Sequence, residues 1–470
     1  MEELRLEVLR QMTGLEDLTL SDDQFEALRR FVEFMREDTP RSAFLLTGSA
    51  GTGKTFMINL FSRLLRRGGY QVLLLAPTGR AAKVITRRTK RLAYTIHHHI
   101  YSPREGISGD IWFDLKPNKE EALTCYIVDE ASMIGDRSED GTGSLLSDLI
   151  SYVYSNNEQR KLLIVGDPVQ LPPVGHKLSP ALDSRWLLRM GQITLTEAHL
   201  SEVKRQMADS LVLENAVLIR DAYLSEGENN PVLETGREVQ PLENPWEAIE
   251  TYLGYYQEGN PDRSVFISYS NGQASRINQA IRRQLHGVEE ALIPSDLLMV
   301  VRNNYAWGDP KRFPFVANGE MGTVRATFPE TYEEKYGLKW MDAEIEFMDS
   351  QGEIIVLYGK LVLDLLNSKL PQLDRQAMQP AFMARQQEYA NLPMSQAAEQ
   401  LRTDPYLNAL QVKYGYCITG HKSQGGQWQN VVISFEPDYG QDMKAYIRWT
   451  YTVFTRAEER IFLLNCPFVT

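Results

Sequence analysis

The sequence predicts an α/β protein with two lobes, each a parallel sheet flanked by helices, and a β-rich subdomain inserted into the second lobe. Three observations carry this prediction. Apolar runs alternate with helical stretches through the first 200 residues, a second such pattern starts near residue 265 and resumes near residue 431, and the segment between them changes character. Runs that are apolar on both faces are typical of buried parallel strands. A chain of 470 residues is also long enough for about two to four domains.

The first lobe is predicted to occupy residues 1–200, as a doubly wound α/β domain. The strands expected in it are residues 43–47, 72–76, 125–128, 162–165 and 193–195. Residues from about 100 to 122 interrupt the alternation with Gly, Pro and charged residues, which predicts a small insertion.

The second lobe is predicted to combine residues 201–324 with residues 413–470, and its expected strands are residues 265–268, 431–434 and 461–464. Residues 325–412 are predicted to form a barrel-like subdomain with helical decoration. Ile345 and Phe347 alternate with Glu344 and Glu346 ahead of a turn-forming Asp349-Ser350-Gln351-Gly352, as in an antiparallel hairpin. A stretch rich in Gln, Ala and Met then indicates helix to about residue 410.

One octapeptide has the pattern of a phosphate-binding loop. It lies between a strand-like and a helix-like run and reads Gly48-Ser49-Ala50-Gly51-Thr52-Gly53-Lys54-Thr55. Glycines let successive backbone N–H groups turn toward phosphate oxygens at a helix N-terminus. Lys54 adds a positive charge at the β- and γ-phosphates, and the Thr55 hydroxyl can bind Mg²⁺. A chance glycine-rich turn is the alternative, but the flanking strand and helix favour nucleoside triphosphate binding. The loop alone does not distinguish a kinase, a switch GTPase, a transporter ATPase or a motor.

Two further polar segments follow buried strands. Asp129 and Glu130 come 75 and 76 residues after Lys54, a placement suited to holding Mg²⁺ with Asp129 and polarising a water with Glu130. Their alternative is an acid pair that caps the next helix. Gln170 lies in a Pro-rich segment after the next strand and is a candidate sensor of the γ-phosphate, although such a segment taken alone is simply a turn.

Composition sets broad limits. A net charge of −12 argues against a protein that coats nucleic acid without specificity, but it allows a local basic groove. Six cations do fall within residues 80–91, where a functional surface is favoured over a solvated helix face. Three distant cysteines give neither a disulfide framework nor a paired metal motif. These features, with a charged N-terminus and no apolar span, predict a reducing, intracellular location, cytoplasmic or nucleoid-associated, with no membrane partner.

Taken in order along the chain, the motifs resemble those of superfamily 1 helicases of the RecD, Dda and Pif-type branch, with compact Dda-like proteins the nearest match. The long N-terminal extension of RecD-type proteins is not seen. After the phosphate loop the matching segments are residues 76–83, 95–97, 129–133, 166–173, 268–271, 318–322, 419–425 and 451–457.

The resemblance implies two RecA-like P-loop NTPase lobes, an SH3-like barrel in the second lobe, and ATP with Mg²⁺ between the lobes. Besides the residues above, it implies an arginine finger at Arg456, assistance from Arg205, an adenine contact from Gln24, and a cofactor contact at Gly425. Alternatives remain for two of these residues. Arg456 can form an ion pair with Glu458 or Glu459, and Gln24 matches a helix capping box with Ser21.

The resemblance also implies contacts with single-stranded DNA in both lobes, made without reading sequence. The implied residues are Pro77, Thr78, Arg80, His97, Thr419, His421, Lys422 and Ser423. Four aromatic residues are candidates for base stacking, although each is favoured as core: Tyr94, Tyr305, Trp307 and Trp428. The triplet His97-His98-His99 is not expected to bind metal, because adjacent side chains diverge.

The expected function is an ATP-dependent DNA helicase that moves on single-stranded DNA and opens forked duplex. The resemblance implies the direction 5′ to 3′, which the residues themselves do not fix. A role in DNA replication, repair or recombination goes with it. We expect a monomer, with single-strand-binding or replication and repair proteins as candidate partners. The alternatives are a motor subunit of a nuclease or repair complex that translocates without strong unwinding, and a nucleotide-gated nucleic-acid-binding module. Residue patterns do not separate DNA from RNA, since backbone contacts discriminate sugars only through the 2′-hydroxyl.

Overall fold

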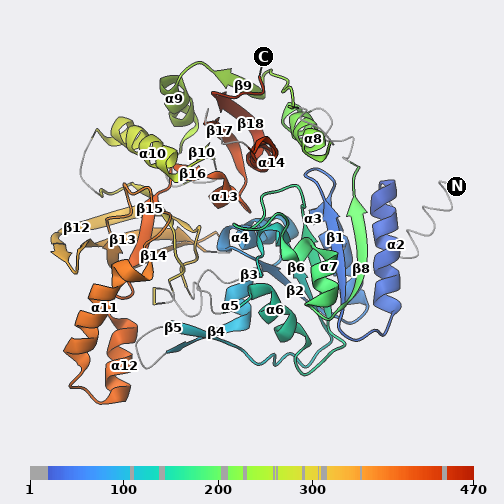
Figure 1. Ribbon diagram of the computed structural model, residues 1–470, viewed down its shortest axis with the longest axis horizontal. Coiled ribbons are helices and arrows are strands. Elements are labelled where there is room, and N and C mark those ends of the chain that lie inside the picture. Colours follow the sequence, from blue (N-terminus) through green and yellow to red (C-terminus); the bar gives the residue numbers. More distant parts are fainter. Residues whose placement is uncertain are drawn as a thin grey trace.

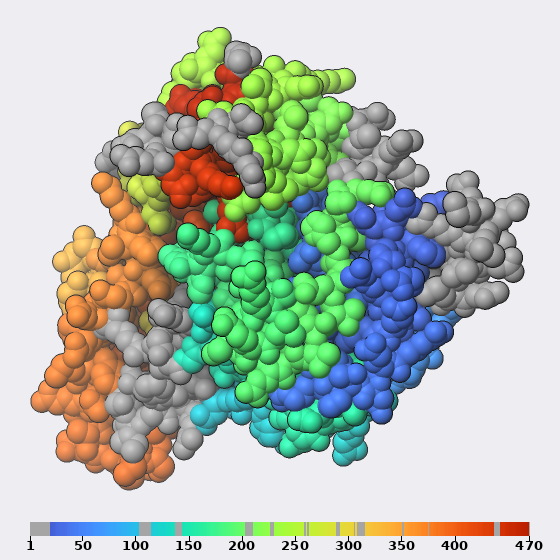
Figure 2. All heavy atoms as spheres, turned by 45° about the vertical axis from the view of Figure 1, so that its right-hand side comes forward, coloured from blue at the N-terminus to red at the C-terminus, as the bar shows by residue number. Residues whose placement is uncertain are grey.

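The protein has two α/β lobes and a closed barrel (Figure 1). The structure is a computed structural model that describes residues 19–105, 111–136, 143–202, 210–225, 230–257, 260, 263–287, 292–304, 306–307, 315–349, 352–436 and 442–469. In the space-filling view, lobe one, in blue to green, meets the red C-terminal residues, and the orange segment lies at the left edge (Figure 2). No helix in the described part of the chain is long and apolar enough to cross a membrane.

Lobe one contains a six-stranded sheet in the order β3-β2-β6-β7-β1-β8, and every pairing in it is parallel. Its strands are β1 (Ser42–Gly48), β2 (Gln71–Ala76), β3 (Ala93–Thr95), β6 (Thr124–Val128), β7 (Lys161–Gly166) and β8 (Thr194–Leu200). Its longer helices are α2 (Asp22–Arg36), α3 (Lys54–Arg67), α4 (Gly79–Thr89), α6 (Leu145–Tyr154) and α7 (Ser184–Arg189). The doubly wound arrangement expected from the sequence is therefore present.

Residue alternation along β1 explains why helices cover both faces of this sheet. Phe44 and Leu46 point to one side, where they are buried with side chains of α2 and α3. Ala43 and Leu45 point to the other side and join the core beneath α6. Phe31 of α2 stacks on Phe61 of α3 with ring centroids 3.9 Å apart. A sheet buried on both faces needs apolar residues on both sides of its central strands, as β1, β6 and β7 have.

Lobe two contains a five-stranded parallel sheet in the order β16-β10-β17-β18-β9. The strands are β9 (Val239–Leu242), β10 (Ser264–Ser268), β16 (Cys417–Thr419), β17 (Trp428–Ser434) and β18 (Ala457–Leu464). The helices are α8 (Leu211–Leu224), α9 (Pro245–Tyr255), α10 (Asn271–His286), α13 (Gly420–Ser423) and α14 (Met443–Phe454).

The inserted subdomain is a closed barrel, as expected, but it is larger than residues 325–412. Its strands are β11 (Leu297–Val300), β12 (Met321–Lys335), β13 (Leu338–Met348), β14 (Ile354–Val362) and β15 (Leu410–Tyr414). β11 pairs with both β12 and β15 and so closes the barrel. The sequence boundary failed here because β11 is a four-residue apolar run, which reads equally well as a strand of lobe two.

Two smaller elements project from this framework. Short helix α5 (Ile96–Ile100) leads into β4 (Tyr101–Glu105) and β5 (Ile111–Leu115), which form the antiparallel hairpin at the expected lobe-one insertion. Helices α11 (Arg375–Tyr389) and α12 (Met394–Thr403) form a helical arm that extends from the barrel toward β4 and β5 (Figure 1).

Candidate nucleotide cleft and nucleic-acid groove

The phosphate loop connects β1 to α3, as its sequence predicts. Gly51 and Gly53 have φ angles of 79° and 89°, in the left-handed region that favours glycine. A Cβ atom on Gly53 would lie 2.5 Å from Nε2 of Gln24, so the loop also needs glycine there for space. The Lys54 ammonium donates to the carbonyl oxygens of Gly48 and Ser49 at 2.7 and 2.8 Å. The Lys54 side chain thus lies along the loop, where it is predicted to bind the β- and γ-phosphates.

Gln24 forms the capping box, one of the two roles expected for it, and also contacts the phosphate loop. Its Oε1 accepts from the Ser21 N–H at 3.3 Å, and the backbone N–H of Gln24 donates to the Ser21 hydroxyl, so the capping box forms. Its Nε2 donates to the Thr52 carbonyl at 2.9 Å, inside the phosphate loop. The fully buried side chain therefore ties the start of α2 to the loop, while an adenine contact stays a prediction.

Asp129 and Glu130 follow β6 directly. Asp129 accepts the Glu130 N–H at 2.8 Å, and Glu130 adopts a left-handed φ of 56°. Burial, and after it the charge of the neighbouring Glu130, raises the pKa of Asp129 to about 7 against the opposing effect of Lys54. Two partly buried acids beside a lysine carry a negative charge that a divalent cation would neutralise. The carboxyl pair therefore fits a Mg²⁺ site formed with Thr55.

The segment after β7 faces the same cleft. Asp167 is 1% exposed and lies 4.0 Å from the Lys54 ammonium. Gln170 is also buried, and its Oε1 has no hydrogen-bond partner among the described residues. A buried amide oxygen without a partner is costly, so this atom is suited to a ligand or water in the cleft. A role for Gln170 as a sensor of the γ-phosphate stays a prediction.

Lobe two reaches this site through one face of α14. The Tyr451 hydroxyl accepts the Ala50 N–H of the phosphate loop at 2.8 Å and donates to Asp167 Oδ2 at 2.7 Å. Thr452 accepts the Leu171 N–H at 2.9 Å. Residues three or four apart share a helix face, and Arg448 lies on the same face.

Arg448 holds the segment that carries Gln170. Its guanidinium donates to the Pro168 carbonyl at 2.7 Å, the Gln170 carbonyl at 2.9 Å and the Val169 carbonyl at 3.2 Å, and it also donates to the carbonyl of Lys177. Neither Arg448 nor Tyr451 was singled out from the sequence. The spacing of Arg448, Tyr451 and Thr452 on one helix was the signal available.

Arg456 is buried where α14 ends. Its guanidinium donates to the Thr452 carbonyl and the Thr455 hydroxyl, both at 2.9 Å. Burial lowers its pKa, and the charges of Glu130 and Asp167 oppose that change, so the cation lies within electrostatic range of both lobe-one acids. Among the described residues Glu458 is 3.6 Å from Arg87 and Arg88 instead, so the alternative ion pair with Glu458 is not formed. Arg205 lies outside the described residues.

A second concavity, a groove of about 2900 Å³, lies between lobe one, lobe two and the helical arm. Seven of the eight residues implied in strand contact line it: Pro77, Thr78, Arg80, His97, Thr419, His421 and Lys422. Ser423 does not, because its buried hydroxyl donates to the Gly420 carbonyl at 2.7 Å. Gly425 lies against lobe one, where an added Cβ would be 2.8 Å from that of Ala81.

Two of the four aromatic candidates, Trp307 and Trp428, are buried in the core. Trp428 is buried beneath the Arg80 guanidinium, which lies 4.6 Å from its ring centroid. Trp307 is buried over Gly359, where a Cβ would come within 2.3 Å of the indole. Tyr94 stacks on His98 at 5.9 Å, and Tyr305 lies outside the described residues. Base stacking by either tryptophan would require it to leave the core.

The basic run on α4 mainly joins domains. Lys83 pairs with Glu320 of the barrel, and Arg87 and Arg88 reach Glu458 of lobe two. Of the cations in this run, Arg80 lines the groove. The prediction that this run is more than a solvated helix face is thus correct, but several of its cations form ion pairs within the protein.

Comparisons with known proteins agree with the motif order. Residues 19–228 match the family described as an AAA domain, and residues 414–464 match the UvrD-like helicase C-terminal domain. The ATP-dependent RecD2 DNA helicase of Deinococcus radiodurans is 33% identical over 37% of this chain and 21% of its own length. An uncharacterized protein of Methanocaldococcus jannaschii is 22% identical over 89% of this chain and 36% of its own length. The chain thus spans only about a third or less of these two relatives. The expected resemblance to helicases of the RecD type is confirmed.

Solved structures with a similar course of the chain include two Pif1 helicases. The Bacteroides protein in complex with ADP-AlF3 and ssDNA is 14% identical, with a TM-score of 0.47 over 97% of this chain and 94% of that one. The Candida albicans protein is 15% identical, with a TM-score of 0.43 over 96% and 95%.

Proposed function

We propose that this chain, a helicase-type P-loop protein with relatives of the RecD type, is an ATP-dependent DNA helicase. It hydrolyses ATP between its lobes, moves 5′ to 3′ along single-stranded DNA and separates the duplex ahead of it. The observation that carries the proposal is the reach of α14 from lobe two to the phosphate loop, where Tyr451 contacts both Ala50 and Asp167. A site built from two lobes can convert nucleotide hydrolysis into relative movement of those lobes.

Each residue then has a role in the cleft. The loop N–H groups and Lys54 bind the phosphates, and Thr55 and Asp129 would hold Mg²⁺. The metal ion neutralises charge that develops on the phosphate oxygens. Glu130 orients and polarises the attacking water. Arg456 supplies positive charge from lobe two when the lobes close, so that hydrolysis depends on closure.

The groove supports nucleic acid as the substrate. Lys422, held by Asn318 Oδ1 at 2.8 Å, and Arg80 place positive charge on its two sides in a chain whose net charge is −12. Thr78 and Thr419 add hydroxyls suited to phosphate contacts without sequence readout. The hairpin of β4 and β5 reaches the same groove through Tyr101 and Asp114, where it can divide two strands.

The test is strand separation on forked DNA that carries only a 5′ or only a 3′ single-stranded tail, with and without ATP. We expect unwinding of the 5′-tailed fork alone, and DNA-stimulated ATP hydrolysis. Lys54→Ala should abolish hydrolysis while leaving strand binding largely intact. ATP hydrolysis without unwinding of either fork would favour a translocase instead, and normal hydrolysis in Lys54→Ala would refute the nucleotide site.

A further inference from the structure

The helical arm has a face that none of the roles above uses. Residues of α11 and α12 line the groove opposite Pro77, Thr78 and Lys422. On α11 the groove-lining residues include Gln379, Phe382 and Gln386, which are spaced three and four apart and so lie on one helix face. Among the groove-lining residues of α12, Ala397, Ala398 and Leu401 are uncharged. The arm therefore presents mainly amide, aromatic and aliphatic groups to the groove.

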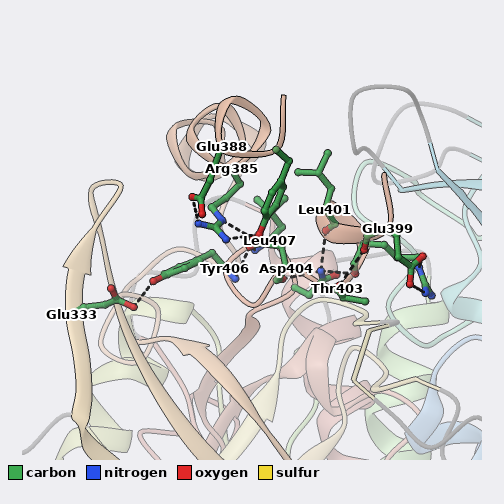
Figure 3. Close-up of polar contacts among 12 residues, drawn as sticks. Glu333, Arg385, Glu388, Glu399, Leu401, Thr403, Asp404, Tyr406 and Leu407 are labelled. Carbon is green, nitrogen blue, oxygen red and sulfur yellow. Dashed lines mark hydrogen bonds and ion pairs between the residues drawn. The ribbon is translucent and has the colours of Figure 1, made fainter. Parts of the chain in front are cut away.

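A buried polar network at its base fixes the direction of the arm (Figure 3). Asp404 has no exposed side-chain surface, and its Oδ2 accepts from Arg385 Nε at 2.5 Å and from the Tyr389 hydroxyl at 2.8 Å. Its Oδ1 accepts the N–H groups of Tyr406 and Leu407. The Tyr406 hydroxyl donates to Glu333 of β12 at 2.7 Å. The network thus joins both arm helices to the barrel wall, and the groove-lining face is held in place.

The charges on the arm are largely satisfied within the arm. Arg385 also pairs with Glu388, and Arg402 pairs with Glu399. Asp374, which lies at the groove, accepts the Ala377 N–H at 2.8 Å as the N-cap of α11. The facing acids of lobe one also have partners: Asp148 accepts from the Tyr101 hydroxyl at 2.6 Å, and Asp136 lies 3.2 Å from His176. These contacts orient the carboxylates without cancelling their charge, and a polyanion would enter the groove beside the cations Arg80 and Lys422.

We propose that the helical arm is a third wall of the nucleic-acid groove, on which a single strand lies with its bases against Phe382 and the amides of Gln379 and Gln386. The inference rests on the proposed function and adds the contacts that the helical arm makes with the strand on the side away from the lobes. Lobe residues such as Lys422 contact phosphates, whereas the arm contacts bases through stacking and amide hydrogen bonds. Aromatic stacking accepts any base, because every base has a π-face.

Because lobe residues contact phosphates and the arm contacts bases, the salt dependence of binding affinity distinguishes the two kinds of contact. Binding through phosphates releases counterions, so the logarithm of affinity falls with the logarithm of salt concentration. Removing one phosphate contact from a single strand should reduce that slope by about 0.7, whereas removing an uncharged base contact should leave it unchanged. Affinity of the full chain for a fluorescein-labelled oligothymidylate, measured by anisotropy at several salt concentrations, provides both quantities.

Phe382→Ala/Gln386→Ala should weaken oligothymidylate binding by about 5- to 150-fold with an unchanged salt slope. Gln→Ala keeps a strong helix former at its position, so the arm should remain helical. The matched control is Met383→Ala/Gln387→Ala on the outward side of α11, where Met383 is 61% exposed and neither residue is among those lining the groove. Thermal unfolding of both double variants checks that the fold is retained.

Lys422→Ala should weaken binding and also reduce the slope. If the arm variant binds the oligonucleotide as tightly as the unmodified chain does, the third-wall proposal is wrong while the helicase proposal stands. A reduced slope in the arm variant, or a loss confined to blunt duplex, would also overturn the assignment to bases of a single strand. If the unmodified chain binds no single strand, both proposals fail.

Discussion

The contact of Arg448 with the segment after β7 yields a quantitative prediction. Arg448→Met keeps most of the apolar volume of the side chain and removes all of its hydrogen bonds. Four carbonyl oxygens, on residues 168, 169, 170 and 177, then lose their charged donor. A hydrogen bond to a charged group contributes about 1.5–3 kcal/mol, but these four share one cation and their contributions do not simply add.

Truncating a buried, hydrogen-bonded charge costs about 2–5 kcal/mol in total. We expect a loss in the lower part of that range, about 2–4 kcal/mol, because Lys177 is exposed and its carbonyl can turn to water. Arg448 is buried, so solvent screening reduces the effect little. The segment carrying Gln170 should also become less well ordered, and ATP turnover should fall by at least tenfold.

Thermal and urea unfolding give the stability of the variant, and steady-state phosphate release gives its turnover. Lys444→Ala is the matched control, because Lys444 is an exposed cation on the same helix. It should change neither quantity measurably. If Arg448→Met retained the stability and turnover of the unmodified chain, Arg448 would not be what holds the segment after β7.

Three other substitutions test separate parts of the protein. Arg456→Ala should retain ATP binding and lose turnover by about 10³-fold or more, as for an arginine finger; a collapse of ATP affinity would instead make its role structural. Gly53→Ala forces a Cβ to within 2.5 Å of Gln24 Nε2 at a left-handed φ of 89°, a backbone cost of about 1–2 kcal/mol before the clash. It should lower the melting temperature and prevent nucleotide binding, and a normal affinity for ATP would contradict the need for glycine. His99→Phe should flatten the loss of stability in acid, because burial, with Lys116 and His98 nearby, lowers the pKa of His99 to about 4. The folded protein favours the neutral ring, whereas the unfolded chain binds a proton at His99 from about pH 6.5 downward. The free energy of unfolding is therefore unaffected by this group above pH 6.5 and falls by up to about 3 kcal/mol as the pH is lowered toward 4. Urea unfolding at pH 7 and pH 4.5 measures this difference, and equal acid sensitivity in the variant would show that other groups dominate.

The sequence predicts the strands of the two sheets well where burial is complete. β1, β6, β7, β10 and β17 are continuous apolar runs, and each of them is found at its expected place. β3 and β16 have only three residues each and carry no periodicity that could be read. Their pairing with β2 and β10 depends on neighbours distant in sequence, so tertiary structure alone defines them.

Candidate site residues were easiest to predict where backbone chemistry demands a residue type. Gly53 and Lys54 belong to a loop whose geometry requires them, and Asp129 follows a strand at the carboxyl edge of the sheet. Trp428 is different, because nothing in its local sequence shows that Arg80 covers it from the other lobe. Arg448 was missed because its partners are backbone carbonyl groups, so its spacing from Tyr451 and Thr452 was the only sequence signal for the contact.

The segment after β7 also connects the nucleotide cleft with the groove. Asp167 lies 4.0 Å from Lys54 at the cleft, while Pro172, Pro173 and the residues through His176 line the groove. Arg448 donates to the carbonyls of Pro168 and Lys177, near the two ends of this segment. Between these two contacts, Gln424, which lies at the groove just beyond α13, donates to the Leu171 carbonyl at 2.7 Å. A displacement of α14 relative to lobe one must therefore move cleft and groove residues together, because fewer than ten residues separate them and packed segments transmit strain. Coupling between ATP turnover and strand movement then requires no long pathway, only two positions of α14 that differ in energy when nucleotide or nucleic acid binds.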